Sequence, residues 1–189
     1  MPIESVTKRL RLRQWNASDR EPFARLNADP RVMEFFFETL GRKESDAMAD
    51  RIESRILENG WGFWVVERLD SGEFIGFVGL NNPPGELPFS PCVEVGWRLA
   101  FEQWGNGYAT EAATRALEIG FETLALSEIV AFTALGNVRS RAVMKRLKTR
   151  DTGETFDHPQ VPVGSSLRRH CLYRLSRTEW AAGSGIRQV

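Results

Sequence analysis

The segment Trp104-Gly105-Asn106-Gly107-Tyr108-Ala109-Thr110-Glu111-Ala112 decides how this chain is interpreted. It follows residues 92–99, which are expected to form a strand, and it leads into residues 108–124, whose apolar positions have helical spacing. Glycines between a strand and a helix let the backbone approach a ligand and direct several amide groups at one point, near the positive end of the helix dipole. We therefore expect this segment to bind phosphate groups.

Two well-known nucleotide motifs do not fit these residues. A dinucleotide-binding fold has the pattern G-x-G-x-x-G, and Thr110 stands where its third glycine belongs. A P-loop needs a Lys directly after a glycine in a fixed register, and this segment has none. NAD and ATP are therefore disfavoured as ligands, while a glycine turn that binds nothing stays an alternative.

The residues before this segment predict one strand and two helices. Residues 6–15 alternate as a half-exposed strand does. Ser18-Asp19-Arg20-Glu21 resembles a capping box, which begins a helix that runs to about Ala28. A second helix is expected from about Ser45 to Asn59-Gly60.

The rest of the chain predicts a central meander and two strand–helix units. A turn at Asp70-Ser71-Gly72 predicts a hairpin. The expected strands are residues 61–68, 73–80, 92–99, 128–134 and 170–175, and a fourth helix begins near Asn137. The order is strand, two helices, three strands, helix, strand, helix, strand, an α/β sandwich, with residues 179–189 as a loose tail.

Composition limits the possible partners. The 189 residues, 42% of them hydrophobic, suit a single domain over residues 1–189. Because 25 Lys and Arg balance 25 Asp and Glu, we expect no binding to nucleic acid or to a membrane. The charged N-terminal residues and the lack of long apolar runs predict a cytoplasmic protein. Cys92 and Cys171 match no metal or redox spacing, so we expect reduced thiols and no metal site.

The glycine segment resembles the cofactor motif of the GNAT superfamily of N-acetyltransferases, R/Q-x-x-G-x-G/A. Gly107 and Ala109 occupy its last two defined positions, and Trp104 stands at the place of the Arg or Gln. The pattern WGxGYATEA over residues 104–112 is similar to the RimJ/RimL-like branch, and the resemblance extends from about Leu10 to Leu175. It implies a mixed, mostly antiparallel sheet flanked by helices, with acetyl-CoA as co-substrate.

The resemblance also implies which residues contact acetyl-CoA. The backbone of the strand before the glycine loop is expected to bond the pantetheine and to polarise the thioester carbonyl, and Asn137 is expected to bond the pantetheine arm. The expected cofactor-binding residues are Trp97, Leu99, Trp104, Gly105, Asn106, Gly107, Tyr108, Ala109, Thr110 and Asn137.

Acetyl transfer needs a neutral amine, and Glu94 is the candidate base. Its strand precedes the glycine loop, and by strand alternation it shares a face with Gly96 and Arg98. An α-amine, with a pKa of about 8, needs less help from a base than a Lys side chain with about 10.4. An ion pair of Glu94 with a neighbouring Arg, or simple exposure to solvent, is the alternative.

The proton donor is less well defined. Many relatives use a Tyr seven residues after the Asn at the start of the fourth helix, and here that place holds Met144, which cannot donate a proton. Ser140, three residues after Asn137, is the substitute that the branch suggests, and solvent is the alternative.

The function expected from this resemblance is transfer of an acetyl group to a primary amine by direct attack in a ternary complex. The acceptor is a protein N-terminal α-amine or a small-molecule amine, next to the aromatic segment Phe35-Phe36-Phe37, of which one or two rings are expected to face the core. Met144 motivates the alternative of a non-catalytic acyl-CoA-binding regulatory module, and another kind of nucleotide-binding protein is a third reading. Both a monomer and a homodimer are compatible with the sequence.

Overall fold

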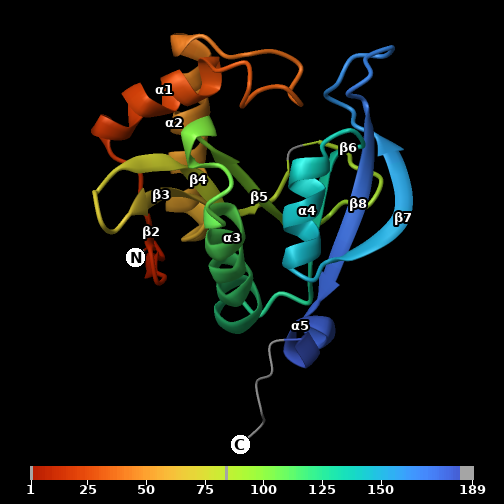
Figure 1. The fold of residues 1–189 in the computed structure, drawn as a ribbon. Coiled ribbons are helices and arrows are strands. Elements are labelled where there is room, and N and C mark those ends of the chain that lie inside the picture. The colour runs from red at the N-terminus through yellow and green to blue at the C-terminus, as the bar shows by residue number, and fades with distance from the viewer. Residues whose placement is uncertain (1, 84, 184–189) are drawn as a thin grey trace, which may run out of the picture.

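The computed structural model describes residues 2–83 and 85–183, which form one eight-stranded sheet with helices on both faces (Figure 1). The strands lie in the order β1-β2-β3-β4-β5-β6-β8-β7. Neighbouring strands are antiparallel except β5 and β6, which are parallel. The expected mixed, mostly antiparallel sheet is thus confirmed.

The strands are β1 Ser5–Val6, β2 Leu10–Arg13, β3 Phe63–Arg68, β4 Phe74–Asn81, β5 Glu94–Leu99, β6 Glu128–Ala134, β7 Arg150–Asp157 and β8 Arg169–Ser176. The α-helices are α1 Arg20–Ala28, α2 Arg42–Asn59, α3 Tyr108–Glu118, α4 Val138–Arg146 and α5 Arg177–Gly183. Short turns of 3-10 helix cover Ala17–Asp19 and Phe101–Gln103, and a π-helical turn, Ile119–Thr123, follows α3.

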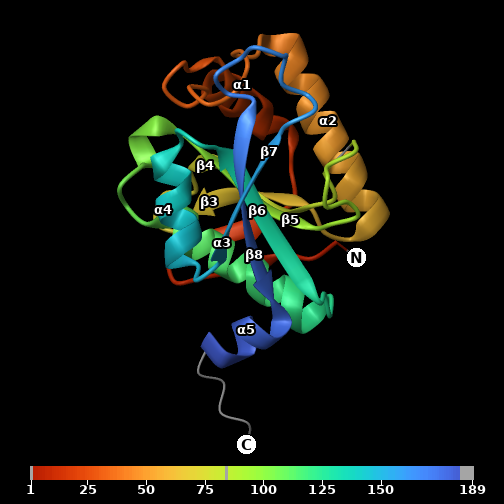
Figure 2. The same ribbon diagram turned by 90° about the vertical axis from the view of Figure 1, so that its right-hand side faces the viewer.

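Each face of the sheet has its own apolar core, because successive side chains along the central strands point to opposite faces. Val95 and Leu99 of β5 pack with Leu117 of α3 on one face. Phe77 of β4 packs with Phe23 of α1 on the other. Helices α3 and α4 therefore cover one face, and α1 and α2 the opposite one (Figure 2).

Between β5 and β6 the sheet is split. These two strands pair at a single position, Glu94 with Val130, whereas β4 and β5 pair at six positions. Ala100 N donates to a carbonyl just before the paired part of β4 at 2.9 Å. Since bonded pairs alternate in an antiparallel ladder, the backbone groups of Trp97 and Leu99 point away from β4, towards β6. We call this split the wedge; its closed end is at Glu94.

Strand β7 was missed by the sequence prediction, for a physical reason. Seven of its eight side chains are not buried, and Phe156 is the buried one. It is an edge strand that pairs with β8 alone, with an irregularity between Asp151 and Thr155. A polar edge strand has no hydrophobic alternation to reveal it.

The predicted first strand, residues 6–15, is two short strands joined by a turn. Thr7 N donates to Leu10 O at 2.8 Å, and Leu10 N donates to the Thr7 hydroxyl at 3.0 Å, so the chain reverses here. The predicted capping box at Ser18 and Glu21 is also wrong. Asn16 and Asp19 form the box, because Asn16 Oδ1 accepts from Ser18 N and Asp19 accepts from Asn16 N.

The other boundaries agree closely, with two further corrections. Helix α2 begins at Arg42, three residues before the predicted start. The predicted loose tail is helical as far as Gly183, because the Trp180 ring stacks on Phe121 at 5.6 Å and Lys148 Nζ donates to Gly183 O at 2.8 Å. Residues 184–189 lie outside the described part.

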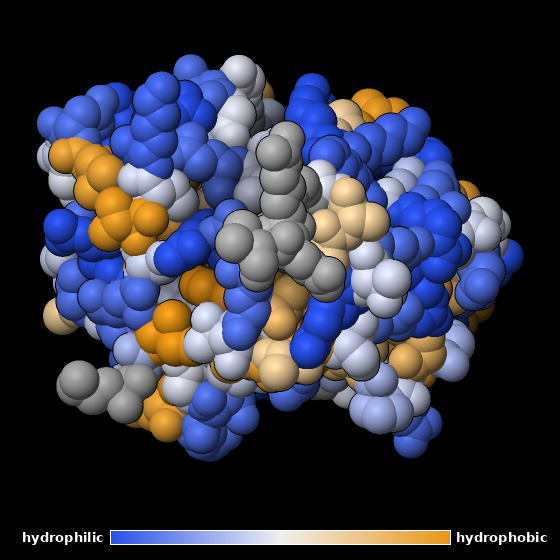
Figure 3. All heavy atoms as spheres, turned by 90° about the horizontal axis from the view of Figure 1, so that it is seen from below, coloured by the Kyte–Doolittle hydropathy of each residue, from blue (hydrophilic) through white to orange (hydrophobic). Residues whose placement is uncertain are grey.

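The surface around α5, seen from below, mixes small hydrophobic groups with hydrophilic ones (Figure 3). No helix in the described residues has the length and apolar character needed to cross a bilayer. Cys92 and Cys171 are both free, as expected.

Candidate functional site

The glycine loop is open where it enters α3. Gly105 and Gly107 have φ angles of 78° and 80°, a left-handed conformation that favours glycine. Gly107 is the N-cap of α3 and supplies no side chain to bond the first amides of the helix. A Cβ at Gly105 would meet nothing within 4 Å. Uncapped amides beside open space are suited to binding a phosphate group.

A clamp from the N-terminal hairpin holds this loop in place. Glu111 of α3 accepts hydrogen bonds from the Thr7 hydroxyl at 2.6 Å, from Arg9 N at 2.9 Å and from Arg9 Nε at 2.7 Å. Arg9 Nη1 also donates to Asn106 O at 3.0 Å. Burial acts against the charged form of Glu111, but the hydrogen bonds from Thr7 and Arg9 outweigh it and lower its pKa. Sequence reasoning missed Arg9 and gave Glu111 no role.

The side chains of the loop itself are engaged in holding its shape. Trp104 Nε1 donates to Leu99 O at 2.9 Å, which ties the loop to the end of β5. Asn106 Nδ2 donates to the carbonyl of Trp104 at 3.2 Å. The Tyr108 ring lies 4.5 Å from the guanidinium carbon of Arg9. The side chains of Trp104, Asn106 and Tyr108 are thus engaged within the protein, which leaves the backbone amides at the start of α3 as the groups suited to a ligand.

Glu94 lies at the closed end of the wedge and is half-buried. Asn81 Nδ2 donates to Glu94 Oε1 at 2.8 Å, and Asn81 Oδ1 accepts from Arg55 Nη1 at 2.5 Å. Burial raises the pKa of Glu94 to about 7, although the Asn81 hydrogen bond and the charge of Arg55 oppose the rise. Within the described residues Glu94 forms no ion pair with an arginine, and its carboxylate is not freely exposed to solvent.

At the open end of the wedge, Asn137 is the N-cap of α4. Its Oδ1 accepts from Ser140 N at 3.1 Å and its Nδ2 donates to Thr133 Oγ1 at 3.0 Å. Met144 is buried in the core, as its thioether requires. The hydroxyl of Ser140 is partly exposed and makes no hydrogen bond inside residues 2–83 and 85–183.

Each of the two tyrosines is engaged with an arginine. Tyr108 lies against Arg9, on the β2 side of α3. The Tyr173 hydroxyl accepts from Arg141 Nε at 3.4 Å, on the side of α4 that faces Asp151. Both are engaged away from the wedge.

Since β5 and β6 are parallel, the segments that follow them lie at the same end of the wedge. The glycine loop after β5 and Asn137 after β6 therefore flank its open end. The structure does not join Glu94 to Ser140: in the described part, Glu94 is bonded to Asn81 and Ser140 to Asn137. A ligand that reaches both must extend along the wedge.

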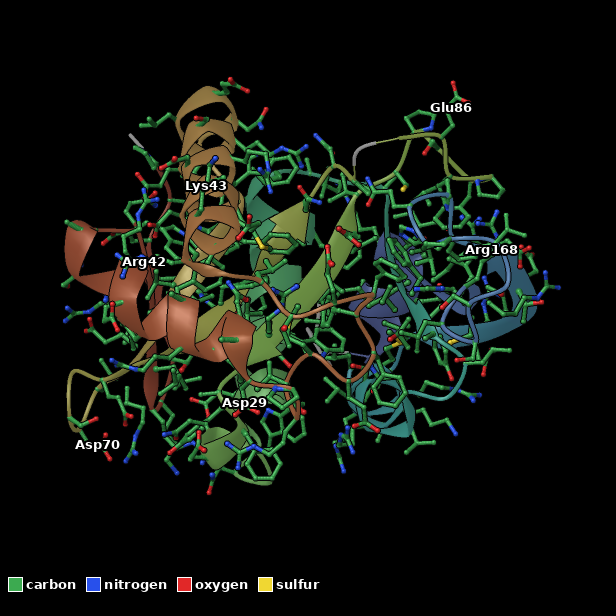
Figure 4. All side chains as sticks on the ribbon, turned by 90° about the horizontal axis from the view of Figure 1, so that it is seen from above. Asp29, Arg42, Lys43, Asp70, Glu86 and Arg168 are labelled. Atoms are coloured by element: carbon green, nitrogen blue, oxygen red, sulfur yellow. The ribbon has the colours of Figure 1, made fainter. Side chains whose placement is uncertain are left out.

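The aromatic segment Phe35-Phe36-Phe37 lies in the α1–α2 loop, and the expectation that one or two rings face the core is wrong. Phe36 and Phe37 are exposed and Phe35 is half-buried. The Phe35 ring lies beside Gly136 of the β6–α4 connection. Seen from above, this loop leaves α1 at Asp29 and extends over the sheet, towards the half that carries Arg168 (Figure 4). The Phe35 ring therefore lies next to the connection that follows β6, at the open end of the wedge.

A split sheet with uncapped helix amides at its open end is suited to a long ligand that carries phosphate groups. The acetyltransferase (GNAT) domain matches residues 9–150 of this chain. The chain belongs to this GNAT acetyltransferase family, and it is an acetyl-CoA-dependent N-acetyltransferase.

Individual proteins agree with this assignment. The chain is 30% identical over 183 residues to the FsC-acetyl coenzyme A-N(2)-transacetylase of Aspergillus fumigatus, covering 92% of this chain and 76% of that protein. It is 29% identical over 112 residues to the putative ribosomal N-acetyltransferase YdaF of Bacillus subtilis, 59% of this chain and 58% of that one. A GNAT-family acetyltransferase structure from Bacillus anthracis has the same fold, with a TM-score of 0.78, 21% identity, and coverage of 94% and 100%.

Proposed function

We propose that this enzyme is a single-domain acetyltransferase of the RimJ/RimL-like branch that acetylates a primary amine by direct attack in a ternary complex, with Glu94 as the base. The segment Trp104–Ala112 and the likeness to a protein described as a putative ribosomal N-acetyltransferase support the branch. The observation that carries the mechanism is the carboxyl of Glu94 at the closed end of the wedge, with its pKa raised to about 7.

The wedge and the glycine loop are suited to acetyl-CoA. The amides of Gly105 to Thr110 bind the pyrophosphate, and Asn137 lies opposite them across the open end. The backbone amides of Trp97 and Leu99, which the β4–β5 ladder does not use, bond the pantetheine and the thioester carbonyl.

Acetyl-CoA supplies the acetyl thioester, and the protein's own groups manage the protons. Glu94 accepts the proton that the amine loses as its nitrogen bonds the acetyl carbon. The amides of Trp97 and Leu99 stabilise the charge that develops on the carbonyl oxygen. The sulfur that leaves takes a proton from the Ser140 hydroxyl or from solvent, since Met144 has none to give.

A thiol-release assay over a panel of peptides and small amines tests this proposal, after acetyl-CoA binding has been measured by calorimetry. We expect binding, and release of free CoA thiol that depends on an acceptor. Binding with no turnover across the panel would instead support a regulatory acyl-CoA-binding module. Tighter binding of NAD or ATP than of acetyl-CoA would overturn the ligand assignment.

A further inference from the structure

Arg98 of β5 is a buried cation without a buried anion. Its side chain is 8% exposed, and burial lowers its pKa to about 10, which leaves it charged at neutral pH. Within residues 2–83 and 85–183 no carboxylate forms an ion pair with it. A buried charge with no opposite charge is costly, so this arrangement calls for a functional explanation.

The guanidinium has one edge in use and one edge unused. Nη1 donates to Asn27 Oδ1 at 2.6 Å and contacts Met48 Sδ at 3.8 Å. Nε is buried and has no hydrogen-bond partner in the described part of the chain. Nε and Nη2 together form the second edge, whose parallel N–H groups match the two oxygens of a carboxylate.

Two aromatic rings lie against this guanidinium, and the centre of the buried Phe77 ring is 5.5 Å from its carbon. The Phe36 ring centre lies 4.0 Å from the Arg98 guanidinium carbon, and Phe36 is itself 41% exposed. Phe36 belongs to the α1–α2 connection, residues 29–41, which contains neither helix nor strand. A shift of this loop would take the Phe36 ring away from Arg98 without unfolding an element of the sheet.

Arg98 also lies on the same face of β5 as Glu94, because side chains alternate along a strand. Four residues of strand separate their Cα atoms by roughly 13 Å. An acceptor that lies along this face of β5 therefore has the proposed base at one end and a cation at the other.

We propose that Arg98 binds a carboxylate of the acceptor, so that the substrate carries a primary amine and, several bonds away, a carboxylate. The inference rests on the proposed function, since it assigns the acceptor of that same site. It makes Arg98 a specificity-determining residue, and it makes Phe36 the ring that the acceptor displaces.

Matched acceptors test this directly. We compare kcat/KM for 6-aminohexanoate and 6-aminohexanamide, which differ only in the charge at the far end. The wild type should prefer the carboxylate by about 10-fold or more, and Arg98→Gln should bring the ratio close to one. Arg25→Gln is the matched control, because Arg25 is an exposed arginine of α1 whose partner is Glu21 at 3.4 Å, and the ratio should be unchanged in it.

A second variant keeps Arg98 and places the missing negative charge next to it within the protein. Asn27→Asp places a carboxylate of the same shape against Nη1, with Ser45 Oγ, now 2.9 Å from Asn27 Nδ2, able to donate to it. The preference for the carboxylate acceptor should fall here too. This variant keeps the test decisive if Arg98→Gln does not fold.

Thermal shifts separate this inference from the proposed function. Hexanoate should raise the melting temperature of the wild type more than hexanamide does, and this difference should vanish in Arg98→Gln, whether or not any amine is acetylated. If no amine is acetylated, the proposed function fails while the shift still supports the carboxylate site. The inference is overturned if hexanoate and hexanamide give equal thermal shifts and both acceptors are used equally. It is also overturned if a loss of acetyl-CoA affinity in Arg98→Gln accounts for the whole change in acceptor preference.

Discussion

At the scale of single residues, Glu94, the proposed base, is oriented by a chain of two hydrogen bonds. Arg55 fixes the amide of Asn81, which is thereby oriented with its Nδ2 towards the Glu94 carboxylate. The amide donates to the carboxylate and so orients it, and this hydrogen bond by itself lowers the pKa of Glu94. Burial then sets the pKa of Glu94 to about 7, the range in which a base works best near neutral pH.

Replacing Glu94 by Gln should lower kcat/KM by about 100-fold and remove one pH dependence. Because the pKa of Glu94 is raised to about 7, the carboxyl is protonated below this pH, and activity in the wild type should rise with pH through it. The titration of the acceptor amine remains in both proteins, so the difference between their pH profiles isolates Glu94. Steady-state rates measured between about pH 5.5 and about pH 9 give the pH profiles of both proteins.

Glu128→Gln is the control for this pH profile. Glu128 lies on the neighbouring strand β6 and pairs with Arg174 at 2.6 Å, away from Asn81. The Glu128→Gln variant should keep the rise in activity near neutral pH. A rise of the same size in Glu94→Gln would mean that another group accepts the proton.

Gly107→Trp should abolish acetyl-CoA binding, because the new ring fills the space beside the uncapped amides of α3. The change also strains the backbone, since Gly107 has a φ of 80°. Gly153→Trp is the matched control: Gly153 has a φ of 73°, a Cβ there meets nothing within 4 Å, and it lies on β7. Calorimetry should find binding in the control and none in Gly107→Trp, and tight binding in Gly107→Trp would refute the loop assignment.

At the scale of elements, the sequence predicts those that bury an apolar face and misses those that do not. Strand β6 was located to the residue because four of its seven side chains are buried, and the start of α4 was located because Asn137 is a good helix N-cap. Strand β7 was missed because Phe156 is its one buried side chain. The short helix α5 was read as a tail because its stabilising partners, Phe121 and Lys148, are far away in sequence.

The same limit applies to the site. The glycine loop is contiguous, so its residues and their order were enough to predict a phosphate-binding turn. The clamp that holds it joins residues 102 positions apart, Arg9 and Glu111, and no local pattern indicates such a pair. The used edge of Arg98 likewise depends on Asn27, which lies 71 positions before it.

Glu111→Gln tests whether that clamp positions the loop. The variant loses the one hydrogen bond in which both partners are charged, from Arg9 Nε to Glu111, worth about 1.5–3 kcal/mol, so the melting temperature should fall by about 3 to 6 °C. Acetyl-CoA affinity should fall as well, by about 3- to 10-fold, because Arg9 no longer holds the Asn106 carbonyl in place.

Glu118→Gln is the matched control on the same helix. Glu118 pairs with Arg115 three residues earlier, and both side chains are a third or more exposed, at 33% and 40%. Such a pair contributes little to stability. Glu118→Gln should therefore change neither the melting temperature nor the affinity appreciably, and equal losses in the two variants would mean that the clamp has no special role.

At the scale of the whole molecule, the sheet is two parts that meet at one backbone pair, Glu94 with Val130. The core on the α3 and α4 face joins them, since Leu99 of β5 and Tyr173 of β8 belong to the same buried cluster. The two parts are therefore held together mainly by side chains. A ligand that bonds β5 inside the wedge and α3 and α4 at its open end adds backbone links between them.

Acetyl-CoA should consequently stabilise the whole molecule and protect particular amides. At a concentration of about 100 times its Kd it adds about 2.7 kcal/mol, which raises the melting temperature of a domain of this size by about 5 to 10 °C. In hydrogen exchange the amides of Trp97 and Leu99 should slow most, because the β4–β5 ladder leaves them facing the wedge. Gly96 and Arg98, whose amides face β4 in that ladder, should be slow already in the free protein and change little. Protection spread evenly over β5 would place the ligand outside the wedge, since a site elsewhere gives no reason for alternate residues to respond differently.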